Sequence, residues 1–150
     1  MTTDLGELTY RRVHQAPREL LFDLMTVPEH LTNFWGPTGT TTPLDRITVD
    51  LRPGGAFETV MVNDSDGDEY TMRAVYTEVE RPDRLAWTEP EGGMTTTITF
   101  TDLGDGSTEV VTHQTNVPEM FRTPEARKGF LTSLDRCEAY LATLTGTAPG

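Results

Sequence analysis

The sequence predicts an α+β fold in which one long C-terminal helix covers a curved antiparallel sheet of seven strands. Residues 124–145 carry one apolar stripe at helical spacing, with clear signals at both ends. Residues 44–115 change to a period of two, and turns of hairpin length separate the strands, which indicates antiparallel pairing. The chain of 150 residues has the size of one domain, with residues 8–145 as its expected core.

The predicted C-terminal helix begins after Thr123, whose hydroxyl can cap the first turn, and ends before Gly146. Pro124 suits the first helical position, and Glu125 complements the positive end of the helix. At 1.5 Å per residue the helix is about 33 Å long, so its stripe needs a long apolar partner surface. The stripe consists of Ala126, Phe130, Leu134, Cys137, Leu141 and Leu144.

The sequence of the N-terminal part predicts a strand that is followed by two short helices. Residues 8–14 are rich in β-forming side chains. Pro17 can open the first helix, and Pro28 restarts the chain as a second helix that ends at Gly36-Pro37.

The other strands follow from apolar residues that alternate between turn signals. Because Val110 and Val111 are adjacent, the sequence leaves open which face of the last strand His113 occupies. These six strands are predicted at residues 47–51, 57–61, 70–76, 85–87, 94–101 and 107–115.

Composition excludes several classes of protein. The net charge is −12 with only 12 Lys and Arg residues, and no basic run is present, so nucleic acid is not an expected partner. No apolar stretch is long enough for a membrane span, and the acidic N-terminus does not resemble a signal peptide, so we expect a cytoplasmic protein. The single cysteine, Cys137, cannot form an internal disulfide and fits a small buried side chain.

No metal or cofactor is expected. The acidic segment from Asp64 to Glu69 would need glycine at the sixth position and glutamate at the twelfth to be an EF-hand loop. Those positions hold Glu69 and Val75, so a hairpin turn explains the segment. No serine lies in a nucleophile elbow, and no phosphate-binding glycine pattern is present.

Several runs, in the right order between residues 8 and 144, resemble a known family. They are residues 12–22, 28–31, 34–37, 50–55, 75–79, 82–88, 129–130, 133–136 and 140–141. The resemblance is to proteins related to the C-terminal domain of the heat-shock-protein-90 ATPase activator, within the START-like (SRPBCC) superfamily. It implies the helix-grip fold, with a hydrophobic cavity between the sheet and the long helix. Phe34 and Phe130 stand where many relatives carry Trp, and Ala74 where Gly is common, which would reshape the pocket.

We expect the cavity to be lined by aromatic and apolar side chains, although side chains of this kind at these spacings are more often plain core. Tyr76 can point its hydroxyl inward, toward a backbone carbonyl or a ligand. Glu78 can face the cavity, but pairing with Arg81 or Arg84 at the rim of the sheet is favoured, and a solvated or core position is favoured for His113. The candidate lining residues are Phe34, Trp35, Phe57, Met61, Met72, Tyr76, Trp87, Phe100, Met120, Phe121, Phe130 and Leu134.

The leading hypothesis is a module that binds an apolar or aromatic small molecule under the long helix. One alternative is an enzyme like the polyketide cyclases or aromatases, in which Glu78, Tyr76 or His113 would move protons. Another is a co-chaperone that contacts the heat-shock protein through its surface. A homodimer is possible through a sheet edge or through Phe34 and Trp35.

Overall fold

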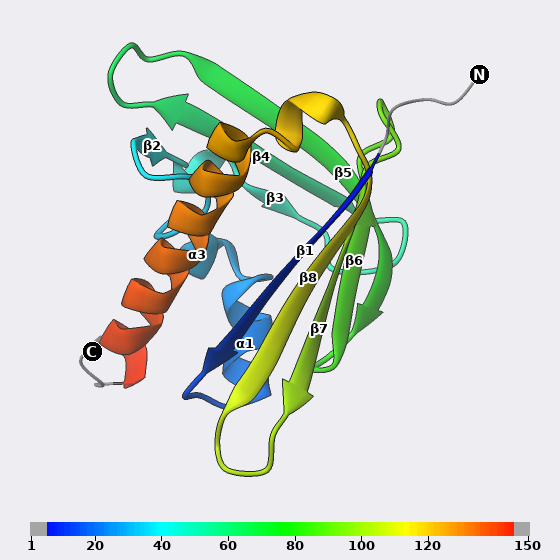
Figure 1. Ribbon diagram of the computed structural model, residues 1–150, viewed down its shortest axis with the longest axis vertical. Coiled ribbons are helices and arrows are strands. Elements are labelled where there is room, and N and C mark those ends of the chain that lie inside the picture. Colours follow the sequence, from blue (N-terminus) through cyan, green and yellow to red (C-terminus); the bar gives the residue numbers. More distant parts are fainter. Residues whose placement is uncertain (1–5, 146–150) are drawn as a thin grey trace.

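The computed structural model describes residues 6–145, which form one curved antiparallel sheet with helices along its concave side (Figure 1). This confirms the predicted α+β helix-grip architecture. The elements are β1 (Gly6–His14), α1 (Arg18–Leu24), α2 (Pro28–Leu31), β2 (Thr40–Thr41), η1 (Leu44–Arg46), β3 (Thr48–Val49), β4 (Ala56–Asn63), β5 (Glu69–Glu80), β6 (Arg84–Thr88), β7 (Thr95–Asp102), β8 (Thr108–Val117), η2 (Glu119–Phe121) and α3 (Pro124–Thr145).

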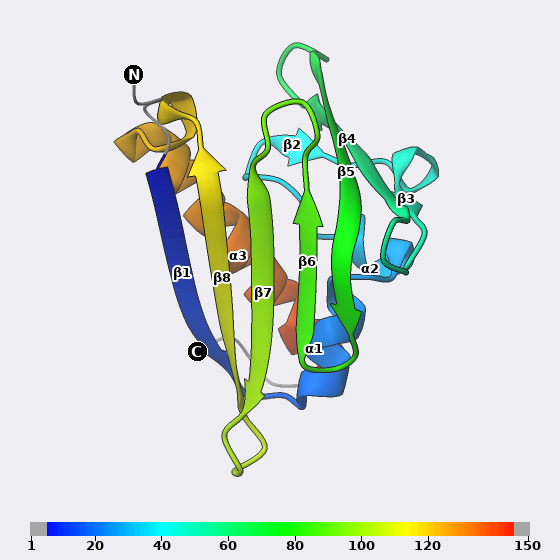
Figure 2. The same cartoon turned by 90° about the vertical axis from the view of Figure 1, so that its right-hand side faces the viewer.

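The sheet has the strand order β1-β8-β7-β6-β5-β4-β2, and β3 pairs beside β2 on β4. Figure 2 shows it from the convex side, with α3 behind the strands. The described residues form eight strands, so the prediction of seven missed one. The additional strand is β2, whose two threonines are too short a run to show any alternation.

The period of two brings the apolar side chains of neighbouring strands together on the concave face. Phe57 lies opposite Ala74 in the β4–β5 ladder, and Tyr76 lies opposite Trp87 in the β5–β6 ladder. All four side chains are buried, whereas Val75 on the opposite face is exposed.

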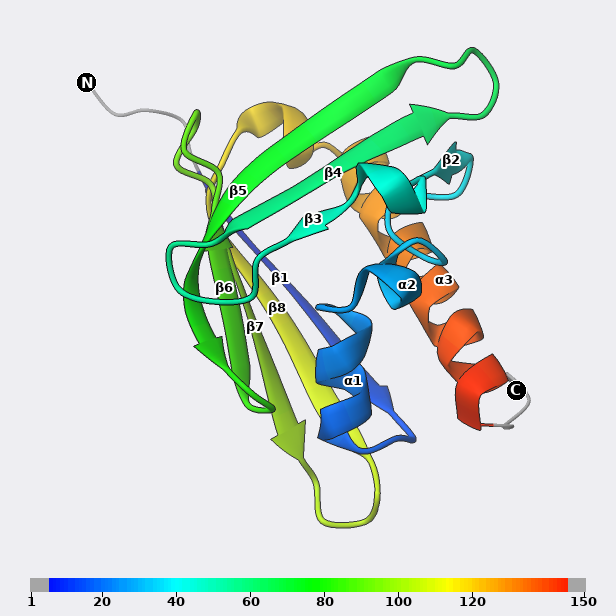
Figure 3. The ribbon, with the colours of Figure 1, turned by 180° about the vertical axis from the view of Figure 1, so that it is seen from behind.

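The two short helices cover one end of this face (Figure 3). Leu21, Phe22 and Leu24 of α1 and Leu31 of α2 are buried in the same core cluster as the sheet residues. The ring of Phe22 packs edge-on against Phe100 of β7, with centroids 5.5 Å apart. Helices α1 and α2 therefore complete the core at the end of the sheet where β1 leads into α1.

Helix α3 has the predicted bounds and the predicted cap, since the backbone N–H of Ala126 donates to Thr123 Oγ1 at 3.1 Å. The apolar stripe is packed unevenly. Leu141 is 5% exposed and is the one residue of the helix that is buried, while Leu144 at the end of the stripe is 42% exposed. The helix thus joins the core mainly through its C-terminal half.

Polar contacts hold the middle of α3. Arg12 of β1 forms ion pairs with Asp135 and Glu138, with N–O distances of 2.9 and 3.1 Å. Arg136 Nη1 donates to the carbonyl oxygens of Gly36 and Pro37 at 2.8 and 3.0 Å. These contacts fix the position of the helix without requiring its whole apolar stripe to be buried.

Candidate functional site

The centre of the concave face is an aromatic cluster, which consists of Trp35, Phe57, Tyr76 and Trp87. Phe57 stacks on Tyr76 with ring centroids 5.3 Å apart and meets Trp87 edge-on at 4.9 Å. Trp35 meets Phe57 at 5.3 Å, and its indole N–H donates to Thr59 Oγ1 at 3.1 Å. The structure therefore brings together four of the predicted lining residues, of which only Trp35 is not fully buried.

The hydroxyl of Tyr76 has no hydrogen-bond partner among the described residues, although the residue is only 1% exposed. The backbone carbonyl that we considered as a partner is therefore not in reach. Burial raises the pKa of this phenol, so it stays neutral and remains a hydrogen-bond donor. An unsatisfied buried hydroxyl costs about 1–3 kcal/mol, and a ligand oxygen is one group that can remove this cost.

The N-terminal half of α3 presents apolar side chains that the core does not take up. We call Ala126, Phe130 and Leu134 the α3 face. All three are half-buried, and they lie outside the core cluster that Cys137 and Tyr140, further along the helix, pack against.

Phe130 has one aromatic partner on the sheet. Its ring stacks on Tyr10 of β1 with centroids 4.3 Å apart, and Tyr10 is half-buried as well. The first half of the helix therefore leaves apolar surface accessible beside the concave face of the sheet.

Three other predicted lining residues, Phe34, Met61 and Met72, differ in how deeply they are buried. Phe34 is buried and lies 6.1 Å from the ring of Tyr140, so together with the half-buried Trp35 it belongs to the core and does not form an exposed patch for a dimer. Met61 and Met72 are half-buried on neighbouring strands of the concave face. Pairing of two chains stays a prediction.

The two polar candidates lie away from the aromatic cluster. A bulge between Tyr76 and Glu78 shifts the β5–β6 register, and Glu78 Oε1 accepts from Arg84 Nε at 3.0 Å, which is one of the two pairings favoured for this residue. The β7–β8 ladder has no bulge, so His113 lies opposite Thr97. This register puts His113 on the convex face, and its Nε2 lies 2.7 Å from Glu7 Oε1.

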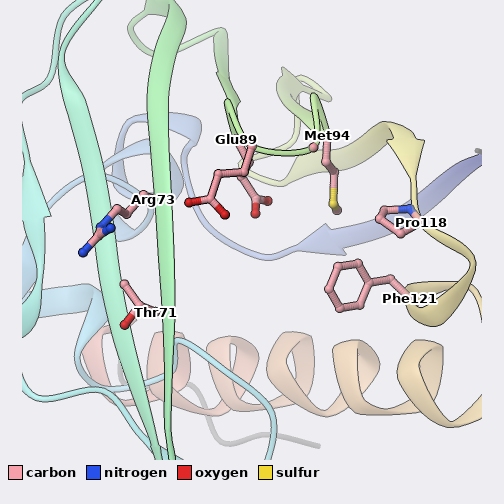
Figure 4. A pocket seen from close by; sticks show the side chains of 8 residues that line it. Thr71, Arg73, Glu89, Met94, Pro118 and Phe121 are labelled. Carbon is pink, nitrogen blue, oxygen red and sulfur yellow. The ribbon is translucent and has the colours of Figure 1, made fainter.

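A cavity of about 450 Å³ lies where β5 extends beyond β6, at the turn between β6 and β7 (Figure 4). We call it the turn pocket. Of the residues predicted to line a cavity, only Phe121 borders it, while Met120 beside it is exposed. Its lining residues are Thr71 and Arg73 of β5, Glu89, Glu91, Gly92 and Met94 of the turn, and Pro118 and Phe121 at η2.

Backbone contacts shape the turn pocket. The N–H of Glu89 donates to the carbonyl of Met94 at 2.9 Å and closes the β6–β7 hairpin. The side-chain amide of Asn116, a residue with φ of 55°, donates to the carbonyl of Gly93 at 3.1 Å. This contact ties the turn to the end of β8, and η2 follows directly after Pro118.

Sequence reasoning missed the glutamates of the turn pocket because Glu91-Gly92-Gly93 was interpreted only as a turn. Glu89 is half-buried, and burial, with a further contribution from the charge of Glu91, raises its pKa above the usual range. A single sequence gave no signal that this turn would face η2.

Neither a metal site nor a reactive thiol is evident in residues 6–145. No group of three or more His, Cys, Asp or Glu side chains is placed to hold a metal ion there. Burial raises the pKa of the Cys137 thiol to about 12, so the thiolate needed for nucleophilic chemistry is scarce near neutral pH. No helix in this part of the chain is long and apolar enough to cross a membrane.

The chain is similar to known proteins both in sequence and in fold. The family model described as Activator of Hsp90 ATPase homolog 1-like protein matches residues 15–142. A solved structure from Nitrosomonas europaea is 24% identical, covers 94% of this chain and 97% of its own, and gives a TM-score of 0.83. One from Chromobacterium violaceum is 25% identical, with 89% and 96% covered and a TM-score of 0.79. The AHSA1 protein from Silicibacter pomeroyi is 21% identical, with 93% and 99% covered and a TM-score of 0.78. No curated protein matches the sequence significantly.

Proposed function

The chain belongs to the family of activator of Hsp90 ATPase homolog 1-like proteins, and from this START-like fold we propose that it binds an apolar or aromatic small molecule between α3 and the concave face of the sheet. The observation that carries the proposal is the half-buried α3 face. A helix whose only task was to close the core would be expected to bury Phe130 and Leu134 as completely as it buries Leu141.

Apolar burial would supply most of the binding free energy. Each Å² of apolar surface removed from water contributes about 25 cal/mol, so an aromatic ligand can gain several kcal/mol by covering Phe130, Leu134 and Tyr10. Orientation would come from a polar group. The neutral hydroxyl of Tyr76 is suited to donate to a ligand oxygen after a small movement of the rings that cover it.

No catalytic step is included in the proposal. An enzyme related to polyketide cyclases would need an acid or base next to its substrate. Glu78 is paired with Arg84 at the rim, and His113 lies on the convex face beside Glu7. Binding alone accounts for the features on the concave side.

The first test is native mass spectrometry of the freshly purified protein, followed by organic extraction to identify any released compound. Binding is then measured with the neutral fluorophore N-phenyl-1-naphthylamine, whose emission increases in apolar surroundings. Leu134→Arg would place a charge on the α3 face and is expected to weaken binding about 10-fold or more.

The matched control is Leu131→Arg, because Leu131 is one turn or less away on the same helix and is 41% exposed. It is expected to bind the fluorophore like the wild type. Absence of saturable binding, or equal loss in both variants, would contradict the proposal.

A further inference from the structure

The turn pocket combines two kinds of wall that the proposed function does not explain. Figure 4 shows Glu89 on one side of the cavity, with Met94, Pro118 and Phe121 on the other. A volume of about 450 Å³ is large enough for a small organic molecule. The pocket therefore has the dimensions and the mixed lining of a separate binding site.

The turn pocket has an acidic wall, formed by Glu89 and Glu91. Within residues 6–145, neither Glu89 nor Glu91 forms an ion pair, although Arg73 lines the same pocket. Figure 4 shows the guanidinium of Arg73 directed away from the carboxylate of Glu89. Partial burial and the neighbouring Glu91 make the ionised form of Glu89 less favourable and raise its pKa. A bound cation would stabilise the ionised form of Glu89 and so offset both effects.

The apolar wall is fixed in place by backbone contacts. The N–H of Phe121 donates to the carbonyl of Pro118 at 3.0 Å, which forms the single turn of η2. Phe121 is 45% exposed, so one side of its ring remains accessible. The side-chain amide of Asn116 donates to the carbonyl of Gly93, next to Met94, so the turn and η2 are both attached to the end of β8.

We propose that the turn pocket binds an organic ammonium ion with an apolar tail. The ammonium group would lie against Glu89 and Glu91, and the tail would cover Met94 and Phe121. The net charge of −12 favours the approach of such a cation over that of an anion. This site does not require the α3 face to be occupied.

The test compares three probes that share one tail: 4-phenylbutylamine, 4-phenylbutanol and 4-phenylbutyrate. Each is titrated into the ¹⁵N-labelled full chain while amide chemical shifts are recorded. The amine should give saturable shifts at residues 89–94 and at Phe121, with at least ~5-fold weaker binding of the alcohol and the acid. Equal binding of all three, or shifts centred on Phe130 and Leu134, would overturn the proposal.

A charge-matched pair of variants separates a local contact from the overall charge. Glu89→Gln with Glu91→Gln is expected to weaken amine binding about 10-fold. Glu29→Gln with Glu80→Gln removes the same charge from two exposed positions outside the turn pocket and should change the affinity less than about 2-fold. Equal effects in both double variants would show that the amine responds only to net charge and would overturn the site.

Retained binding of N-phenyl-1-naphthylamine in the variant with both pocket glutamates replaced would show that the α3 face and the turn pocket work independently. Loss of that binding in the same variant would contradict the separate site.

Discussion

Replacing Tyr76 by Phe should stabilise the protein, which is unusual for a change in a core. The substitution keeps the ring that stacks on Phe57 and removes a hydroxyl that is buried without a partner. The cost of such a group is about 1–3 kcal/mol, so we expect the free energy of unfolding to increase by ~1 kcal/mol. For a domain of this size, that corresponds to a rise in melting temperature of about 2–4 °C.

Tyr140→Phe is the matched control because its hydroxyl is hydrogen-bonded to His30 Nδ1 at 2.6 Å. Loss of this contact should destabilise the protein by about 0.5–1.5 kcal/mol, opposite in sign to the effect at Tyr76. Urea unfolding measures both, and with a slope near 2 kcal/mol/M the midpoint of Tyr76→Phe should move up by about 0.5 M. A Tyr76→Phe protein that is less stable than the wild type would refute the assignment of an unpartnered hydroxyl.

Three further predictions concern other parts of the fold. Arg12→Ala removes two ion pairs to α3 and should lower stability by about 1 kcal/mol in thermal unfolding. Arg11→Ala removes one longer pair, made by a more exposed arginine, and should lower stability by less than about 0.5 kcal/mol. Burial lowers the pKa of His14 in the folded state, so the unfolded state binds more protons. Stability should therefore fall as the pH drops below about 6.5. In urea unfolding at about pH 5 to 7, His14→Asn should make stability depend less on pH. Cys137, with a pKa of about 12, should resist monobromobimane at pH 8 in the folded protein and react once urea unfolds it; equal rates would contradict the raised pKa of this partly buried thiol.

The elements that the sequence predicted are those with two independent local signals. Helix α3 combines a cap at Thr123 with a long apolar stripe, and both its bounds agree with the structure. The strands combine alternation with turn residues. The two-residue strand β2 has turn residues on both sides but is too short to show alternation, and its pairing with β4 depends on where the rest of the fold places the loop after α2.

The candidate site was predictable only in part, for a related reason. Alternation identifies Phe57 and Tyr76 as neighbours on one face, because a strand repeats every two residues. The turn pocket depends on the approach of Phe121 to a turn nearly 30 residues earlier in the chain. Glu78 shows the same limit within one strand, because a bulge after Tyr76 ends the simple alternation.

The uneven packing of α3 connects stability with the proposed function. Leu141 is buried, and Arg12 and Arg136 fix the helix through polar contacts, so the position of the helix does not depend on burying Phe130 and Leu134. A ligand that covers the α3 face would then gain binding free energy from surface that the fold has left accessible. Because the anchoring contacts already order the helix, little of that gain would be lost to the entropy of ordering the backbone.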